Sequence, residues 1–125
     1  MSLDGKTALV TGGGSGIGRA TAQALSRDGA TVVVSDVEEP GGTATVDSIK
    51  AGGGQALFVR ADVSQAEQVE ELVERTVAEY GRLDCAFNNA GIAGAAARTA
   101  DYQEKHWDRV IAINLTGVWL CMKYE

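Results

Sequence analysis

Short apolar runs bounded by polar residues or glycine recur along the chain and predict four β-strands. They span Thr7–Thr11, Thr31–Ser35, about Gln55–Arg60, and Leu83–Asn88. The runs are almost continuously apolar, whereas a strand with one face in water alternates apolar and polar residues. The pattern therefore favours strands that are buried on both faces, as in a parallel sheet.

Apolar residues at helical spacing predict a helix after each of these strands. The first helix runs from about Gly16 to Asp28, and Gly29 follows as its C-terminal stop. Pro40 suits the first turn of the second helix, which ends in the three glycines at 52–54. Strands and helices thus alternate through the first half of the chain.

The third and fourth helices are predicted from caps and apolar stripes. Ser64 and Glu67 have the spacing of a capping box at the start of the third helix, and Gly81 ends it. Its buried face is expected to contain Val69, Leu72, Val73, Val77 and Tyr80. Asp101 and Glu104 are expected to cap the fourth helix, whose apolar stripe contains Trp107, Val110, Ile111, Asn114, Leu115, Val118 and Met122. An unpaired amide buried in that stripe would be costly.

The alternation of strands and helices predicts an α/β fold of one domain, residues 1–125. We expect a Rossmann-type, doubly wound parallel sheet with strand order 3-2-1-4, truncated after the fourth strand and its following helix. The strand order reverses between the first and fourth strands. A ligand crevice is expected at that point, beside the carboxyl ends of the strands.

A glycine-rich turn connects the first strand to the first helix, reading Thr-Gly-Gly-Gly-Ser-Gly-Ile-Gly over residues 11–18. Gly12 allows a sharp turn off the strand, and Gly16 allows a pyrophosphate to approach the backbone. Gly18 allows the helix to pack closely. The N–H groups at the helix N-terminus then face the phosphates, where the helix dipole favours negative charge. Such a turn alone often has only a packing role, but the strand, turn, helix, second strand and terminal acid together predict a dinucleotide-binding βαβ unit.

Asp36 follows the second apolar run, where a carboxylate can accept hydrogen bonds from an adenosine ribose and repel a 2′-phosphate. A solvated acid at a strand end is the simpler alternative. A magnesium-nucleotide P-loop is rejected because Arg19 and Ala20 follow the last glycine, and alanine has no hydroxyl for the metal. The sequence therefore favours a dinucleotide site over a nucleoside triphosphate site.

Composition narrows the partners. The formal net charge is −6, and no basic stripe is present to meet nucleic acid. The uncharged stretch Ala86–Ala97 is too short, and too rich in glycine and asparagine, to span a bilayer. The N-terminus lacks a signal-peptide pattern, so a cytoplasmic location is expected with Cys85 and Cys121 as free thiols, although sequence alone leaves a disulfide open. His106 lies in no cluster of metal ligands, so no metal is expected.

Four motifs together resemble the short-chain dehydrogenase/reductase family. They are the glycine-rich turn, Asp62-Val63 after the third strand, Asn88-Asn89-Ala90-Gly91 after the fourth, and Asn114 between Ile113 and Leu115. The resemblance extends from Lys6 to Tyr124. It implies a nicotinamide cofactor bound by Gly12, Ser15, Gly16, Ile17, Gly18, Asp36, Asp62, Val63, Asn89, Ala90 and Gly91.

The resemblance also implies roles for single residues. Asp62 and Val63 would contact adenine, and Asn88 would hold the strands together. Asn114 would act in catalysis by organising a water in the proton relay. Ser15 and Val37 supply no cation where the family often places one for NADP, so NAD is preferred. The fourth helix carries a second apolar face, and in the family this helix pairs with its copy, which implies a homodimer or homotetramer.

The family's proton-transfer residues, a serine, a tyrosine and a lysine, lie after the position of Asn114. Here no serine follows Asn114, and Tyr124 is followed only by Glu125. Tyr102 and Lys105 precede Asn114 at the wrong spacing and are rejected. We expect the cofactor-binding half of an NAD(H)-dependent oxidoreductase that interconverts an alcohol and a ketone or aldehyde, inactive by itself. The alternative is a non-catalytic nucleotide-binding or interaction module; a methyltransferase is disfavoured.

Overall fold

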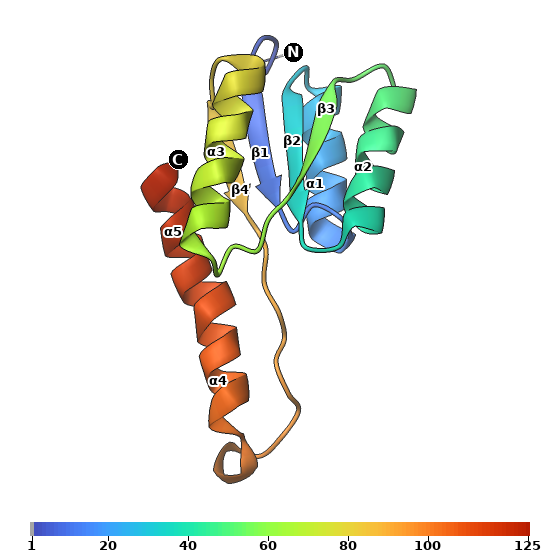
Figure 1. Cartoon of the computed structure of the whole chain (residues 1–125). Helices are drawn as coiled ribbons and strands as arrows, with labels where there is room; N and C mark the ends of the chain where they lie inside the picture. The colour runs from blue at the N-terminus through green and yellow to red at the C-terminus, as the bar shows by residue number, and fades with distance from the viewer. Residues whose placement is uncertain (1) are drawn as a thin grey trace.

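A parallel sheet of four strands forms the centre of the molecule (Figure 1). The computed structural model describes residues 2–125. The strands are β1 (Thr7–Thr11), β2 (Thr31–Asp36), β3 (Ala56–Arg60) and β4 (Cys85–Asn88). Their spatial order is β3-β2-β1-β4, which confirms the order expected from the sequence. The two edge strands are therefore β3 and β4.

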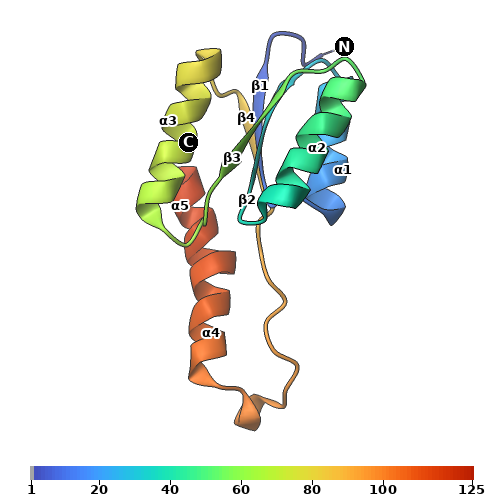
Figure 2. The same ribbon diagram turned by 45° about the vertical axis from the view of Figure 1, so that its right-hand side comes forward.

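Helices cover both faces of this sheet (Figure 2). On one face lie α1 (Gly16–Arg27) and α2 (Glu39–Ala51). On the other lie α3 (Ala66–Tyr80) and α5 (Gly117–Tyr124). Alternate residues of β1 supply the two cores, because Ala8 and Val10 pack with α1 and α2 whereas Leu9 packs with Leu72 of α3.

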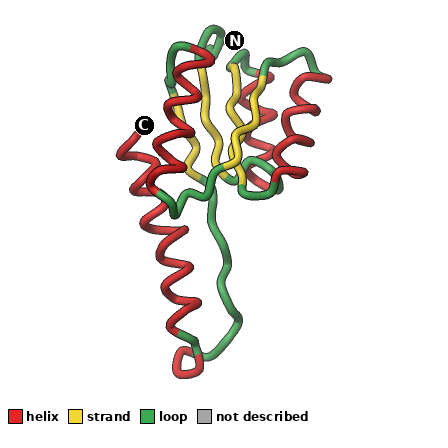
Figure 3. Tube along the Cα trace, in the orientation of Figure 1, coloured by secondary structure: helices red, strands yellow, loops and turns green. Residues whose placement is uncertain are grey.

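The chain after β4 leaves this layered body (Figure 3). A loop is followed by a single 3-10 turn (Thr99–Asp101) and by α4 (Glu104–Ile111), which contains no buried residue. A π-helical turn (Ala112–Thr116) joins α4 to α5. The helix that the sequence predicted as one regular element is therefore interrupted at Asn114.

The predicted caps of α3 and α4 are wrong. Helix α3 begins one residue after Gln65, and the Ser64 hydroxyl donates to Asp62 Oδ1 at 2.6 Å instead of capping the helix. In α4 the cap position is Gln103, whereas the Asp101 carboxylate accepts from Arg98 Nε at 2.7 Å. In both places a nearer polar partner captures the side chain that the sequence pattern assigned to the helix N–H groups.

The predicted apolar faces need two corrections. In α3, Thr76 is fully buried and bonds the Leu72 carbonyl, whereas Val77 is 44% exposed. In the last helix the inward face is formed by Gly117, Leu120 and Cys121. The stripe expected to be buried is mostly exposed, and its largest members Trp107, Leu115 and Met122 are 59–63% accessible. Residue 117 decides the orientation, because a Cβ there would lie 2.8 Å from a methyl of Val63.

Both cysteine thiols are free in the structure. Cys121 is buried, and this burial raises its pKa to about 12, so the thiol stays neutral. Between residues 2 and 125, no helix is both long enough and apolar enough to cross a bilayer.

Candidate functional site

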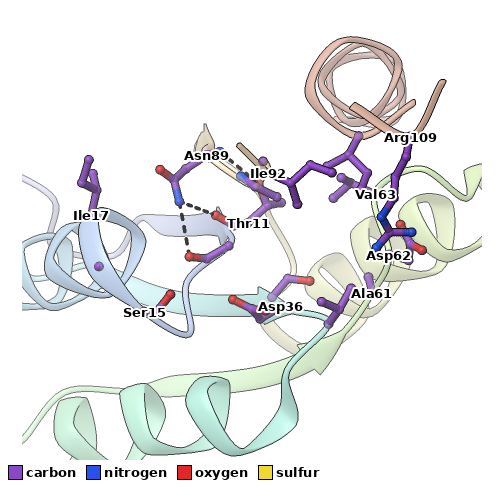
Figure 4. Close-up of a pocket in the computed structure, with 17 residues that line it drawn as sticks. Thr11, Ser15, Ile17, Asp36, Ala61, Asp62, Val63, Asn89, Ile92 and Arg109 are labelled. Carbon is purple, nitrogen blue, oxygen red and sulfur yellow. Dashed lines mark hydrogen bonds between the residues drawn. The ribbon is translucent and has the colours of Figure 1, made fainter. Parts of the chain in front are cut away.

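A cavity of about 390 Å³ opens beside the carboxyl ends of the strands (Figure 4). It lies where the strand order reverses between β1 and β4, as the sequence predicted. Every residue predicted to bind the cofactor lines it except Gly18. The structure thus brings these together: Gly12, Ser15, Gly16, Ile17, Asp36, Asp62, Val63, Asn89, Ala90 and Gly91.

The three glycines of the turn have different structural positions. Gly12 and Gly16 have positive φ angles of 63° and 51°, a region that favours glycine. No atom lies within 4 Å of a Cβ placed on Gly16, so the turn leaves open space at that point. A Cβ on Gly18 would instead overlap the Gly12 carbonyl oxygen and lie 2.7 Å from Asn89 Nδ2. Gly18 therefore packs α1 against the turn and against the segment after β4.

The Asp36 carboxylate is held by two main-chain donors. Its Oδ2 accepts from the Gly14 N–H at 2.9 Å, and its Oδ1 accepts from the Glu38 N–H at 3.0 Å. Because one donor is in the glycine-rich turn and the other precedes α2, the carboxylate is fixed at the end of β2 on the cavity wall. Asp36 is therefore more than a solvated acid.

Asp62 lines the cavity from the segment after β3, next to Val63. Its Oδ1 accepts from the Ser64 main-chain N–H at 2.9 Å as well as from the Ser64 hydroxyl. Its own N–H donates to Gln68 Oε1 at 2.8 Å. These bonds fix the loop that carries Asp62 and Val63 into the cavity wall.

Asn89 ties the segment after β4 to the glycine-rich turn. Its side-chain Nδ2 donates to the carbonyls of Thr11 and Gly12 at 3.2 and 3.3 Å (Figure 4). The N–H groups of Asn89 and Ala90 both donate to the Thr11 hydroxyl at 3.1 Å. The buried Thr11 hydroxyl is a site component that the sequence analysis missed.

Asn88 faces a different environment from Asn89. Its Nδ2 donates to Glu125 Oε2 at 3.0 Å, which joins β4 to the end of α5. Its buried Oδ1 has no hydrogen-bond partner among residues 2–125.

Asn114 does not line the cavity and is exposed, contrary to the buried position expected from the helical stripe. Its Oδ1 accepts from the Ile92 N–H at 2.9 Å, and its Nδ2 donates to the Ile92 carbonyl at 2.8 Å. Both ends of the amide are thus paired with one main-chain residue. Because Ile92 lines the cavity, Asn114 supports the cavity wall through Ile92 without lining the cavity itself.

Several further cavity residues were not predicted from the sequence to line the site. Ser35 is 1% exposed, and its hydroxyl has no hydrogen-bond partner within residues 2–125. Arg109 reaches the cavity from α4 on the side of Asp62 (Figure 4). The end of a predicted strand could have marked Ser35, whereas only the tertiary fold brings α4 to this place. The remaining members are Val37, Ala61 and Ile113.

Metal-ligating side chains do not cluster in the described part of the chain. Within residues 2–125, no group of three or more His, Cys, Asp or Glu side chains is placed to hold an ion.

Comparison with known proteins gives a consistent family. The short chain dehydrogenase family matches residues 6–124. A short chain dehydrogenase/reductase of Aspergillus oryzae is 46% identical over 100% of this chain and 48% of its own length. A 2,5-dichloro-2,5-cyclohexadiene-1,4-diol dehydrogenase of Sphingobium indicum is 47% identical over 98% of this chain and 48% of its own.

Solved structures agree with these relatives. The NAD+-bound structure of a xylitol dehydrogenase superimposes with a TM-score of 0.96 at 35% identity, over 99% of this chain and 48% of that one. A levodione reductase superimposes with a TM-score of 0.93 at 40% identity, over 97% and 48%. The chain spans about half the length of the curated relatives it matches. On its motifs, its fold and these matches, the chain belongs to the short chain dehydrogenase family.

Proposed function

We propose that this chain is the cofactor-binding part of an NAD(H)-dependent oxidoreductase that interconverts an alcohol and a ketone or aldehyde. One observation carries the proposal: the glycine-rich turn, Asp36 and the Asn89–Gly91 segment converge on a single cavity at the reversal of strand order. The structural relatives include two that were solved with NAD bound. When bound, the nicotinamide ring supplies the hydride chemistry.

The residues of the cavity fit a dinucleotide. The open space at Gly16 leaves room for a diphosphate beside the start of α1, where the helix dipole favours an anion. The Ser35 hydroxyl is a buried polar group that a ligand atom or a water could pair with. Asp36 would accept from a ribose hydroxyl while its two main-chain donors keep it in place.

Asn114 is proposed to serve catalysis through position. Its amide pairs with both main-chain groups of Ile92. It therefore holds Ile92, which lines the cavity, against the π-helical turn. The 125 residues contain no serine after Asn114, and only Glu125 follows Tyr124. We therefore expect no turnover from this chain in an NADH absorbance assay with alcohols and ketones. Turnover would require a proton donor other than those of the family.

Cofactor choice tests the proposal. Asp36 would place its charge against the 2′-phosphate of NADP, so the chain should bind NAD+ about tenfold or more tightly than NADP+ in isothermal titration calorimetry. The double variant Asp36→Ser with Val37→Arg should narrow or reverse this preference. Glu39→Ala removes an exposed acid nearby in α2 and serves as the charge control. Equal affinity of the unmodified chain for both nucleotides would contradict the assignment of NAD.

We further propose a homodimer or homotetramer formed through the exposed apolar stripe of α4 and α5. The large apolar side chains on this stripe are 54–63% accessible; they are Trp107, Leu115, Trp119 and Met122. Exposed apolar side chains that form a patch mark a site of interaction with another protein. Trp119→Glu should shift the mass measured by light scattering toward the monomer. A monomeric wild-type chain at micromolar concentration would refute this assembly.

A further inference from the structure

Two side chains hold the glycine-rich turn from the side that faces away from the cavity. Arg19 of α1 donates from Nη2 to the Gly14 carbonyl at 2.6 Å and from Nε to Thr45 Oγ1 at 3.0 Å. Thr45 of α2 is fully buried, and its hydroxyl lies 2.8 Å from the Gly13 carbonyl. Neither Arg19 nor Thr45 lines the cavity.

The Thr45 hydroxyl has one proton and two acceptors in reach. The Gly13 carbonyl at 2.8 Å is nearer than the Gly41 carbonyl at 3.1 Å, which belongs to its own helix. Its oxygen meanwhile accepts from the Arg19 guanidinium, which has only donors to offer. The Thr45 hydroxyl of α2 thus connects Arg19 of α1 to the Gly13 carbonyl of the turn.

These contacts determine where the opposite ends of two peptide groups point. The peptide bonds of residues 2–125 are trans and planar, so the C=O and N–H of each peptide point in opposite directions. In the Gly13–Gly14 peptide, Thr45 engages the carbonyl and Asp36 Oδ2 engages the N–H. In the Gly14–Ser15 peptide, Arg19 engages the carbonyl, so the Ser15 N–H points the other way, and Ser15 lines the cavity.

Space at this junction is tight enough to transmit a displacement. A Cβ on Gly14 would lie 2.8 Å from Asp36 Oδ2, and a Cβ on Gly41 would lie 2.6 Å from the Gly14 carbonyl oxygen. The start of α2 therefore packs directly on the turn. A shift of Gly14 would therefore also displace the Asp36 carboxylate or the start of α2.

We propose that Arg19 and Thr45 are positioning residues for nucleotide recognition. Thr45 orients the Gly13–Gly14 peptide and through it the Asp36 carboxylate, which reads the ribose. Arg19 orients the Gly14–Ser15 peptide, whose N–H is presented to the diphosphate. This inference rests on the proposed binding of NAD and assigns separate parts of that site to two residues outside it.

Isothermal titration of NAD+ and NADP+ against variants of the 125-residue chain tests the division of roles. Arg19→Leu should weaken both nucleotides by a similar factor, about tenfold, because they share the diphosphate. Thr45→Val should weaken NAD+ more than NADP+ and so narrow their ratio. Thr45→Ser, which keeps the hydroxyl, should restore the wild-type ratio. Arg27→Leu removes the same charge from the last turn of α1 and should change neither affinity.

Amide hydrogen exchange without nucleotide provides a second measurement. The Gly14 N–H should exchange faster in Thr45→Val and Arg19→Leu than in the wild type, and not in Thr45→Ser. Arg19→Lys, which keeps the charge and loses the forked geometry, replaces Arg19→Leu if the latter fails to fold.

The two measurements separate the two proposals. Folded Arg19 and Thr45→Val variants that bind both nucleotides as the wild type does would overturn the positioning roles, whatever the exchange rates. A wild-type chain that binds neither nucleotide would instead overturn the proposed function. In that case unchanged Gly14 exchange would also refute the hold of Arg19 and Thr45 on the turn, and faster exchange would support it.

Discussion

The two walls of the cavity are built in different ways. The wall from β1, α1 and β2 is part of the packed body, with strands that are almost entirely buried. The opposite wall, formed by residues 89–113 after β4, includes a mostly exposed loop and α4, which buries no residue. The core holds the first wall, whereas the second depends on a few side chains, so we expect the first to be fixed and the second to be adjustable.

Two asparagines connect the second wall to the rest of the molecule. Asn89 bonds Thr11 and Gly12 at the near end of the loop, and Asn114 bonds Ile92 from the π turn. A site with one fixed and one adjustable wall can hold a ligand in a set position while the other side closes over it. The substitutions below test whether stability and mobility follow this division.

The largest effect is expected at Gly18, where the two walls meet. Gly18→Ala would push a methyl group into the Gly12 carbonyl and the Asn89 side chain, and should lower the free energy of unfolding by about 2–3 kcal/mol. Urea unfolding measures the change. Gly16→Ala is the matched control, because its Cβ meets open space and only the positive φ costs about 1 kcal/mol. Similar losses in both variants would mean that close packing at Gly18 is unimportant.

A smaller and more local effect is expected at Asn114. Asn114→Ala removes both hydrogen bonds to Ile92 and should cost about 1 kcal/mol, since the site is exposed. Hydrogen exchange in residues 91–103 should rise, while exchange in β1 and β2 stays unchanged. Thr116→Ala changes another exposed residue of the same π turn and should leave the loop as it is. A uniform rise across the sheet would show that the walls are not independent.

The smallest effect on stability is expected at Asp84, which precedes β4 and connects it to the start of β1. The Arg82 side chain and then the Thr7 N–H hold its pKa below the ordinary value of 3.8. A lowered folded-state pKa stabilises the fold above the unfolded-state pKa, and this is lost as pH falls through the folded value. The stability difference between the wild type and Asp84→Asn should therefore be constant at neutral pH and shrink below pH 3.8. A difference independent of pH would exclude this linkage.

The fixed wall could be predicted from the sequence, whereas only the Asn89–Gly91 segment of the adjustable wall could. Glycines at 12, 16 and 18 and an acid after the second strand specify a backbone that few other residues allow. The last helix is apolar on two sides, so counting apolar residues could not select the buried one. The close contact of Gly117 with Val63 made that selection, and a residue without a side chain is invisible to such a count.

The missed caps have a related cause. Ser64 and Asp101 each had a competing partner within a few residues, Asp62 and Arg98, which spacing rules do not weigh. The cavity members Thr11 and Ser35 belong to strands whose register is needed before their neighbours across the sheet are known. Local patterns thus predicted the elements, while contacts between elements decided which side chains are free for the site.

The carboxylate of Asp36 has two roles, because the same side chain contributes to the choice of ligand and to the shape of the backbone. It accepts from the Gly14 and Glu38 N–H groups, so replacing it frees two main-chain donors at the same time as it removes a charge. On the proposed function, a lineage that changed its nucleotide preference at this position would also have to repair the turn. Asparagine is the replacement that best preserves the turn, because its side-chain oxygen can take the place of Oδ2 and still accept from the Gly14 N–H.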